Sequence, residues 1–133
     1  MLYGKEHVET YQRTGGAEGH DWNGTTILLL TTRGRRSGRS YTTPLIYQPH
    51  GDSYVVVASK GGAPEDPDWY ANLLADPEVE VQVKADRFRA RARTATDEEK
   101  PELWALMTAT WPDYDSYQLK TDRPIPVVVL ERA

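Results

Sequence analysis

Six short segments with β-strand character, spread along the chain, constrain the fold more than any other feature of this sequence. Residues 25–32 form an apolar run flanked by threonines, and residues 78–83 alternate valine with glutamate and glutamine. Such patterns are typical of buried and half-buried strands. The other predicted strands are residues 40–47, 53–59, 87–94 and 125–130. Pro44 places residues 40–47 at a sheet edge or bulge, because proline lacks the amide hydrogen that a central strand donates.

Helices are predicted between these strands. Residues 5–13 form a short polar helix that ends at Gly15 and Gly16. Asp66 is the expected N-cap of a second helix with Pro67 in its first position, and residues 96–99 match a capping box that starts a third. The expected fold class is α+β and mainly β, with about six strands and two or three helices. A compact, mostly antiparallel barrel with helices outside it is the simplest such architecture.

The length of 133 residues suits a single domain, residues 1–133, with residues 1–24 as an N-terminal helix and loop that is the candidate mobile segment. The net charge of −4 argues against a nucleic-acid binder. No apolar stretch approaches the roughly 20 residues of a transmembrane helix, and no signal peptide is recognisable, so we expect a cytoplasmic protein. Cysteine is absent and the three histidines lack ligand spacing, so no metal site is expected.

A turn rich in arginine is the first candidate site. Residues 33–39 read Arg-Gly-Arg-Arg-Ser-Gly-Arg and connect the first two predicted strands. Guanidinium groups and exposed amides bind phosphates and carboxylates. The turn is not a P-loop, because the Gly-Lys-Ser/Thr ending is absent. A charged hairpin turn that serves only solubility is about equally compatible with the spacing.

Two further segments carry candidate site residues. Residues 59–62 (Ser-Lys-Gly-Gly) follow an apolar strand, their glycines let a ligand approach the backbone, and Lys60 suits an anion. Trp111, Tyr114 and Tyr117 recur every three residues, so in a helix they share one face that suits a flat conjugated ligand. The alternatives are a plain flexible loop and ordinary packing aromatics, the latter favoured roughly two to one on spacing alone.

In this order, the motifs resemble the deazaflavin-dependent nitroreductase family of actinobacteria. The resemblance runs from Trp22 onward and rests on residues 28–38, 43–45, 58–62, 67–73, 76–77 and 121–128. It implies a split β-barrel like that of the FMN-binding relatives of pyridoxamine-phosphate oxidase. It also implies coenzyme F420 as cofactor, a deazaflavin with an anionic phosphate and polyglutamate tail.

The resemblance also implies residue roles. The phosphate and tail would contact Arg35, Arg36 and Ser37, with Lys60 as a further anion contact. The ring would lie against Pro44, Ala58, Gly61 and Gly62, in a pocket closed by Trp69 and Asn72. The substrate would lie between the ring and Trp111, Tyr114 and Tyr117, with Ser59 or Tyr114 as the catalytic hydrogen-bond or proton donor.

The implied activity is hydride transfer from the reduced cofactor to a small electrophile: a quinone, a nitroaromatic compound or an enone such as a coumarin-type lactone. Nitroimidazole reduction is not implied, because Trp111 stands where the family's nitroimidazole-reducing member has tyrosine. A homodimer is the expected assembly. Three alternatives remain, because one fold hosts many functions: a non-catalytic cofactor carrier or sensor, an FMN-dependent oxidoreductase, and a structural domain without cofactor.

Overall fold

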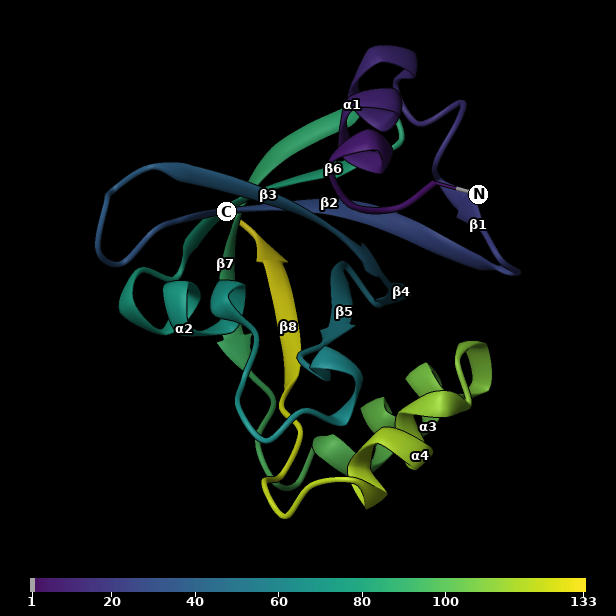
Figure 1. Cartoon of the computed structure of the whole chain (residues 1–133), viewed down its shortest axis with the longest axis vertical. Coiled ribbons are helices and arrows are strands. Elements are labelled where there is room, and N and C mark those ends of the chain that lie inside the picture. Colours follow the sequence, from purple (N-terminus) through teal and green to yellow (C-terminus); the bar gives the residue numbers. More distant parts are fainter. Residues whose placement is uncertain (1) are drawn as a thin grey trace.

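The computed structural model describes residues 2–133, and its centre is an antiparallel sheet of eight strands that curls into a half-barrel (Figure 1). The strands follow the order β1-β2-β6-β7-β8-β5-β4, and β3 pairs with β2. Their bounds are β1 Asp21–Trp22, β2 Thr25–Arg33, β3 Ser40–Ile46, β4 Gln48–His50, β5 Ser53–Val57, β6 Glu78–Val83, β7 Asp86–Thr94 and β8 Val127–Arg132.

Four α-helices lie outside the sheet in the described part of the chain (Figure 1). They are α1 Gly4–Thr14, α2 Asp68–Ala75, α3 Lys100–Thr110 and α4 Asp113–Leu119, and a short 3-10 turn, η1, covers Lys60–Gly62. The counts exceed the expected six strands and two or three helices because β1 and β4 are very short and because the aromatic segment is itself helical. Pro49 and His50, expected in a turn, belong to β4, which pairs only with β5 and therefore tolerates a proline.

Local sequence signals explain most element boundaries. Pro44 lies opposite Leu29 in β3, which pairs only with β2, so the expected edge position is confirmed. Gly15 ends α1 in the left-handed conformation at φ 59°. The capping box is also confirmed: the Thr96 amide donates to the Glu99 carboxylate at 2.9 Å, and the Glu99 amide donates to Thr96 Oγ1 at 3.2 Å. These bonds form a turn that leads into α3 at Lys100.

The expected start of α2 was wrong. This helix begins at Asp68, its N-cap residue is Pro67, and no side chain caps it. The carboxylate of Asp66 instead accepts a hydrogen bond from Arg123 Nη1 at 2.9 Å. This bond joins two charged groups, whereas a capping bond would join the carboxylate to a neutral amide, and it comes from a residue far along the chain.

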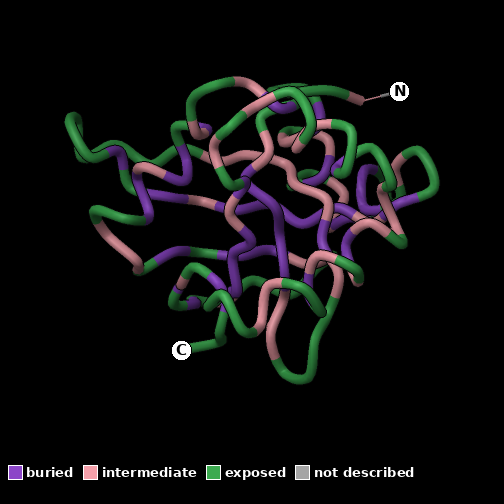
Figure 2. Tube along the Cα trace, turned by 90° about the horizontal axis from the view of Figure 1, so that it is seen from below, coloured by how far each residue is buried: buried purple, intermediate pink, exposed green. Residues whose placement is uncertain are grey.

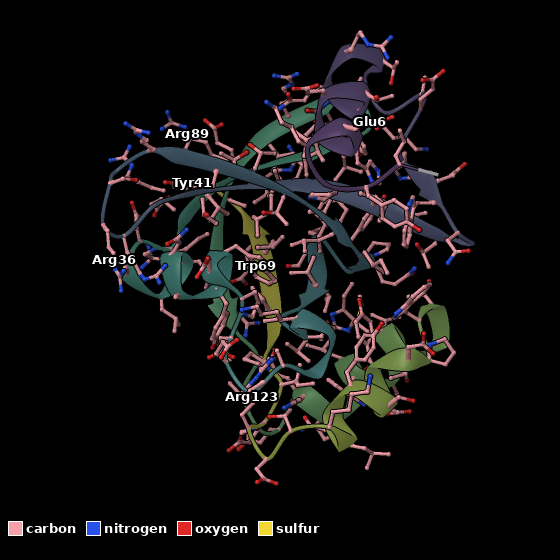
Figure 3. All side chains as sticks on the ribbon, in the orientation of Figure 1. Glu6, Arg36, Tyr41, Trp69, Arg89 and Arg123 are labelled. Carbon is pink, nitrogen blue, oxygen red and sulfur yellow. The ribbon has the colours of Figure 1, made fainter. Side chains whose placement is uncertain are left out.

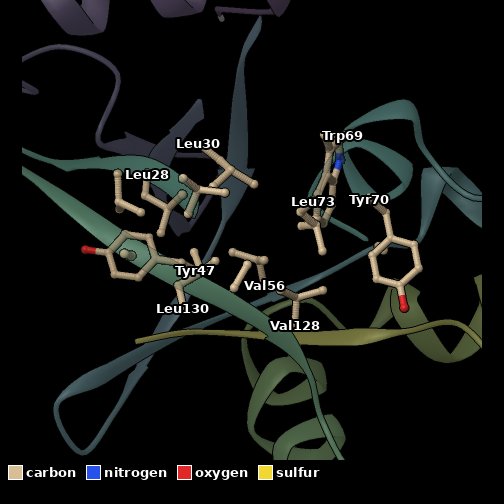
Figure 4. Packing of buried hydrophobic residues seen from close by; sticks show 14 residues of the cluster. Leu28, Leu30, Tyr47, Val56, Trp69, Tyr70, Leu73, Val128 and Leu130 are labelled. Atoms are coloured by element: carbon tan, nitrogen blue, oxygen red, sulfur yellow. The ribbon is translucent and has the colours of Figure 1, made fainter. Parts of the chain in front are cut away.

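The main core fills the concave side of the curled sheet, beneath α2 (Figure 4). Leu28, Leu30, Val56 and Val128 are fully buried there. Trp69, Tyr70 and Leu73 of α2 pack onto this cluster. Buried residues follow the crossing strands through the centre of the molecule, whereas the connecting turns are exposed (Figure 2). Because these three side chains are buried in the core, α2 is held in place against the sheet. This matters because α2 also carries residues of the functional site described below.

Helix α1 is held by a buried tyrosine that the sequence pattern did not single out. Tyr11 is fully buried, its hydroxyl donates to the Ile27 carbonyl at 2.9 Å, and it accepts the Lys84 amide at 2.7 Å. Burial raises the pKa of Tyr11 to about 12. These bonds tie the N-terminal segment to β2 and to the β6–β7 turn. No helix in the described residues is long and apolar enough to cross a bilayer.

Candidate functional site

Two cavities border β3 and contain most of the predicted site residues. The first has a volume of about 500 Å³ and lies between the β2–β3 turn and α2. The second has a volume of about 340 Å³ and lies among β3, the loop after β5, α4 and the N-terminal segment. Thr43 lines the first cavity and Pro44, the next residue, lines the second. The two cavities thus have consecutive residues of the same strand in their walls.

The β2–β3 turn folds tightly enough to present its arginines to the first cavity. The Gly34 amide donates to the Arg39 carbonyl at 2.7 Å, and Ser37 Oγ accepts the Arg39 amide at 3.2 Å. A Cβ at Gly34 would lie 2.6 Å from the ring of Tyr41, so only glycine permits this packing. Ser37 also shares a hydrogen bond of 3.1 Å with the Tyr41 hydroxyl.

Asn72 of α2 orients Arg35. Its side-chain oxygen accepts the Arg35 backbone amide at 3.2 Å and Arg35 Nη1 at 2.8 Å, while its Nδ2 donates to Thr32 Oγ1 at 3.3 Å. Asn72 is only 4% exposed, and Asp68 lies 3.7 Å from Arg35 Nη2. The prediction placed Asn72 against the cofactor, and the structure adds that it positions an arginine.

Arg36 lies at the tip of the turn, near α2 and Trp69 (Figure 3). Its side chain is exposed and has no ion-pair or hydrogen-bond partner within residues 2–133. A guanidinium in this state is available to a phosphate or carboxylate without breaking an existing bond.

Arg123 builds the loop that follows β5, and the sequence analysis assigned it no role. Its side chain is 14% exposed. Nη2 donates to the Ser59 carbonyl at 2.8 Å, Nε donates to the Ala63 carbonyl at 2.8 Å, and Nη1 reaches Asp66. The sequence could have indicated a role for Arg123 through its position in residues 121–128, one of the segments that carry the family resemblance.

The predicted site residues divide into three groups. The first cavity contains Arg35, Arg36, Ser37, Trp69 and Asn72. The second contains Pro44, Ser59, Gly61, Trp111, Tyr114 and Tyr117. Outside both lie Ala58 and Gly62, which are buried, and Lys60, whose Nζ is 3.2 Å from Glu65 Oε1. An anion bound by Lys60 would therefore have to compete with Glu65.

The expected aromatic face is present in the second cavity. Trp111, Tyr114 and Tyr117 all line it, and Trp111 Nε1 donates to the Tyr117 hydroxyl at 3.3 Å. Tyr114 is 5% exposed, and burial raises its pKa above the ordinary value. Its hydroxyl has no hydrogen-bond partner among the described residues. The phenol is thus protonated at neutral pH and can donate to a ligand.

The sequence analysis did not assign the opposite wall of this cavity. Leu2, Tyr3, Gly4 and His7 line it from the N-terminal segment, and Trp22 joins them from β1. The first cavity likewise includes Tyr41, Thr42, Thr43 and Asp68 beyond the predicted set. No local motif marks these positions, because they become neighbours only in the folded chain.

The residues present fit a deazaflavin with an anionic tail. Arg35 and Arg36 face the first cavity, where phosphate and carboxylates would be neutralised. Apolar and aromatic side chains dominate the second cavity, which suits a flat ring and a flat acceptor. The distribution of charge and aromatic surface thus matches the two ends of such a molecule.

Comparison with known proteins agrees with this geometry. Residues 3–132 match the family model described as F420H(2)-dependent quinone reductase. An F420H(2)-dependent quinone reductase of Mycobacterium tuberculosis is 42% identical over 130 residues, which cover 95% of this chain and 87% of the relative.

Two solved structures extend the comparison to the fold. An F420-H2 dependent reductase is 42% identical with a TM-score of 0.73, covering 79% of this chain and 93% of its own. A domain-swapped dimer is 38% identical with a TM-score of 0.77, covering 95% of this chain and 92% of its own. The expected split β-barrel is confirmed, and the chain belongs to the F420H(2)-dependent quinone reductase family.

Proposed function

We propose that this protein binds reduced F420 and reduces a quinone to the quinol. The observation that carries the proposal is that consecutive residues of β3, Thr43 and Pro44, line a cavity with two arginines and a second cavity walled by aromatic side chains. The bound cofactor supplies the hydride. The family membership and the mycobacterial relative support the same activity.

The chain's own residues position the reactants. Arg35 and Arg36 neutralise the anionic tail in the first cavity, and Asn72 fixes the direction of Arg35. Pro44 and Gly61 border the ring on the side of β3 and the loop. With the tail held, the ring has few orientations available, which lowers the entropy cost of reaction.

Ser59 and Tyr114 are the proposed donors to the acceptor. Hydride addition to a quinone leaves negative charge on an oxygen, which a hydrogen bond from a neutral hydroxyl stabilises. Tyr114 meets this requirement because its phenol is protonated and unpaired in the described chain, and Ser59 lines the same cavity. Trp111 and Tyr117 complete the wall against which a flat acceptor lies. Nitroaromatics and enones, which are also flat electrophiles, are proposed as further acceptors.

We also propose a cytoplasmic homodimer. A relative solved as a domain-swapped dimer supports the assembly. Sedimentation of the purified protein measures it, and a monomer at micromolar concentration would contradict this part of the proposal.

The decisive experiment titrates the protein with oxidised F420 and then follows oxidation of the reduced form by menadione. Arg36→Ala is expected to weaken F420 binding by about 1–3 kcal/mol, or roughly fivefold to 150-fold, the effect of a lost charge-assisted bond. Arg91→Ala is the matched control, because Arg91 is exposed, pairs with Glu78 and lies outside both cavities.

Three outcomes would contradict the proposal. Failure to bind F420 at low salt removes the cofactor assignment, and binding without oxidation by any acceptor leaves a carrier. Co-purification of FMN in a yellow protein would favour the FMN-dependent alternative.

A further inference from the structure

We infer that Trp22 determines acceptor specificity by fixing the N-terminal segment as one wall of the acceptor cavity. This inference rests on the proposed function. Trp22 lines the second cavity together with Leu2, Tyr3 and Gly4. It lies in β1, a two-residue strand that pairs only with β2, so its backbone has a firm support on one side.

A single hydrogen bond links the wall to this support. The indole Nε1 of Trp22 donates to the Leu2 carbonyl at 2.7 Å, a short bond for N–H···O. The ring of Tyr3 meets the ring of Trp22 edge to face at 5.7 Å. The first backbone bond of α1, from the His7 amide to the Tyr3 carbonyl, is long at 3.3 Å and secures the segment less firmly. The indole therefore attaches residues 2 and 3 to β1 through one hydrogen bond and one ring contact.

Trp22 also reaches the opposite wall. Its ring centroid lies 6.0 Å from that of Trp111, the residue that ends α3 just before α4 begins. One side chain thus sets the spacing between the two sides of a cavity of about 340 Å³. In Figure 1, β1 and the helices α3 and α4 lie on the right-hand side of the view. A compact acceptor contacts both sides, whereas an extended acceptor must pass the N-terminal wall.

The cavity for the cofactor tail is built from other elements. Residues of the β2–β3 turn, β3 and α2 line it, and the N-terminal segment contributes none of them. A change at Trp22 should therefore alter acceptor choice while leaving F420 affinity intact. A variant with a general structural defect would instead change both acceptor choice and F420 affinity.

The test compares Trp22→Phe with the wild type. Phenylalanine keeps an aromatic ring at the cavity but removes the donor to Leu2. The ratio of kcat/KM for menadione to kcat/KM for a menaquinone with an isoprenoid chain is expected to fall at least threefold, mainly through KM for menadione. The F420 dissociation constant should stay within twofold. Lys5→Ala, on the exposed face of α1 and paired only with Glu9, is the control and should leave the ratio unchanged.

Hydrogen exchange of the protein without cofactor gives a second readout. Amide exchange in residues 3–7 is expected to accelerate in Trp22→Phe and to keep the wild-type rate in Lys5→Ala. An unchanged acceptor ratio, or unchanged exchange in residues 3–7, would overturn the inference. Absence of quinone turnover in the wild type would refute the proposed function instead, so the two failures are distinguishable.

Discussion

Replacement of Asn72 by leucine tests how the first cavity gains its affinity. Asn72 contributes no charge, yet its side-chain oxygen accepts two hydrogen bonds from Arg35, at 2.8 and 3.2 Å. Leucine has a similar volume and accepts neither bond. The guanidinium of Arg35 would then keep only its looser ion pair with Asp68, at 3.7 Å, and would have to be ordered when the tail binds.

The expected loss of F420 affinity equals the free energy needed to order the Arg35 side chain on binding. Immobilising one long side chain on binding costs about 0.5–1.5 kcal/mol, so Asn72→Leu should weaken F420 binding by roughly twofold to 12-fold. The unfolding free energy should fall as well, by about 0.5–1.5 kcal/mol, because the partly buried Arg35 amide loses its acceptor. Fluorescence titration with F420 measures the first effect, and urea unfolding measures the second.

A control on the same helix separates the two effects. The Tyr70 hydroxyl shares a hydrogen bond of 2.7 Å with Thr94 Oγ1, and Tyr70 lies outside the first cavity. Tyr70→Phe should lose stability by about 0.5–1.5 kcal/mol while keeping F420 affinity. If Asn72→Leu loses stability but binds F420 as the wild type does, the orientation of Arg35 contributes nothing to affinity and the reasoning is wrong.

Further predictions concern protonation and anchoring. Tyr114→Phe should lower quinone turnover by about tenfold with little change in F420 affinity, the effect of one hydrogen bond of about 1.4 kcal/mol. Because burial raises the pKa of Tyr114 above its ordinary value of 10.0, stopped-flow rates of the wild type should show no alkaline loss from this group below pH 10. Hydrogen bonds from Arg93 lower the pKa of Glu99 from its ordinary 4.5 to about 2, so this pair stabilises the fold above pH 4.5 and loses that effect as the pH falls towards 2. Glu99→Gln should therefore unfold at lower urea than the wild type at pH 7, and the difference should vanish near pH 2; a difference independent of pH would contradict the assignment. Tyr11→Phe should lower the unfolding free energy by about 1–3 kcal/mol, because the buried Ile27 carbonyl loses its donor and the Lys84 amide loses its acceptor, and an unchanged urea midpoint would refute the role of this anchor.

Local sequence signals predicted the parts of the fold that depend on near neighbours. Gly15 ends a helix, Pro44 marks an edge strand, and the capping box before α3 forms the expected bonds. The helix end at Gly15 and the capping box depend on bonds between residues a few positions apart. The edge position of β3 follows from the amide hydrogen that Pro44 lacks. The arrangement of strands into a split barrel was predicted from the resemblance of the motifs as a set.

Long-range partners explain what the sequence could not predict. Asp66 has the right local context for a helix cap, but an arginine 57 positions later takes its carboxylate. The bond from Trp22 to the Leu2 carbonyl carries no sequence signal, since every residue has a carbonyl. The roles of Lys60 and Ala58 in cofactor binding stay predictions.

The contacts of Arg123 have a consequence for how the protein is made. Its bond to the Ser59 carbonyl spans 64 positions, so the loop after β5 leaves the ribosome long before its partner does. Domains dominated by such distant contacts form them late. A nascent chain released before residue 123 would display the arginine turn but would lack the side chain that holds this loop. The loop that borders the second cavity is thus completed only when the chain is nearly finished.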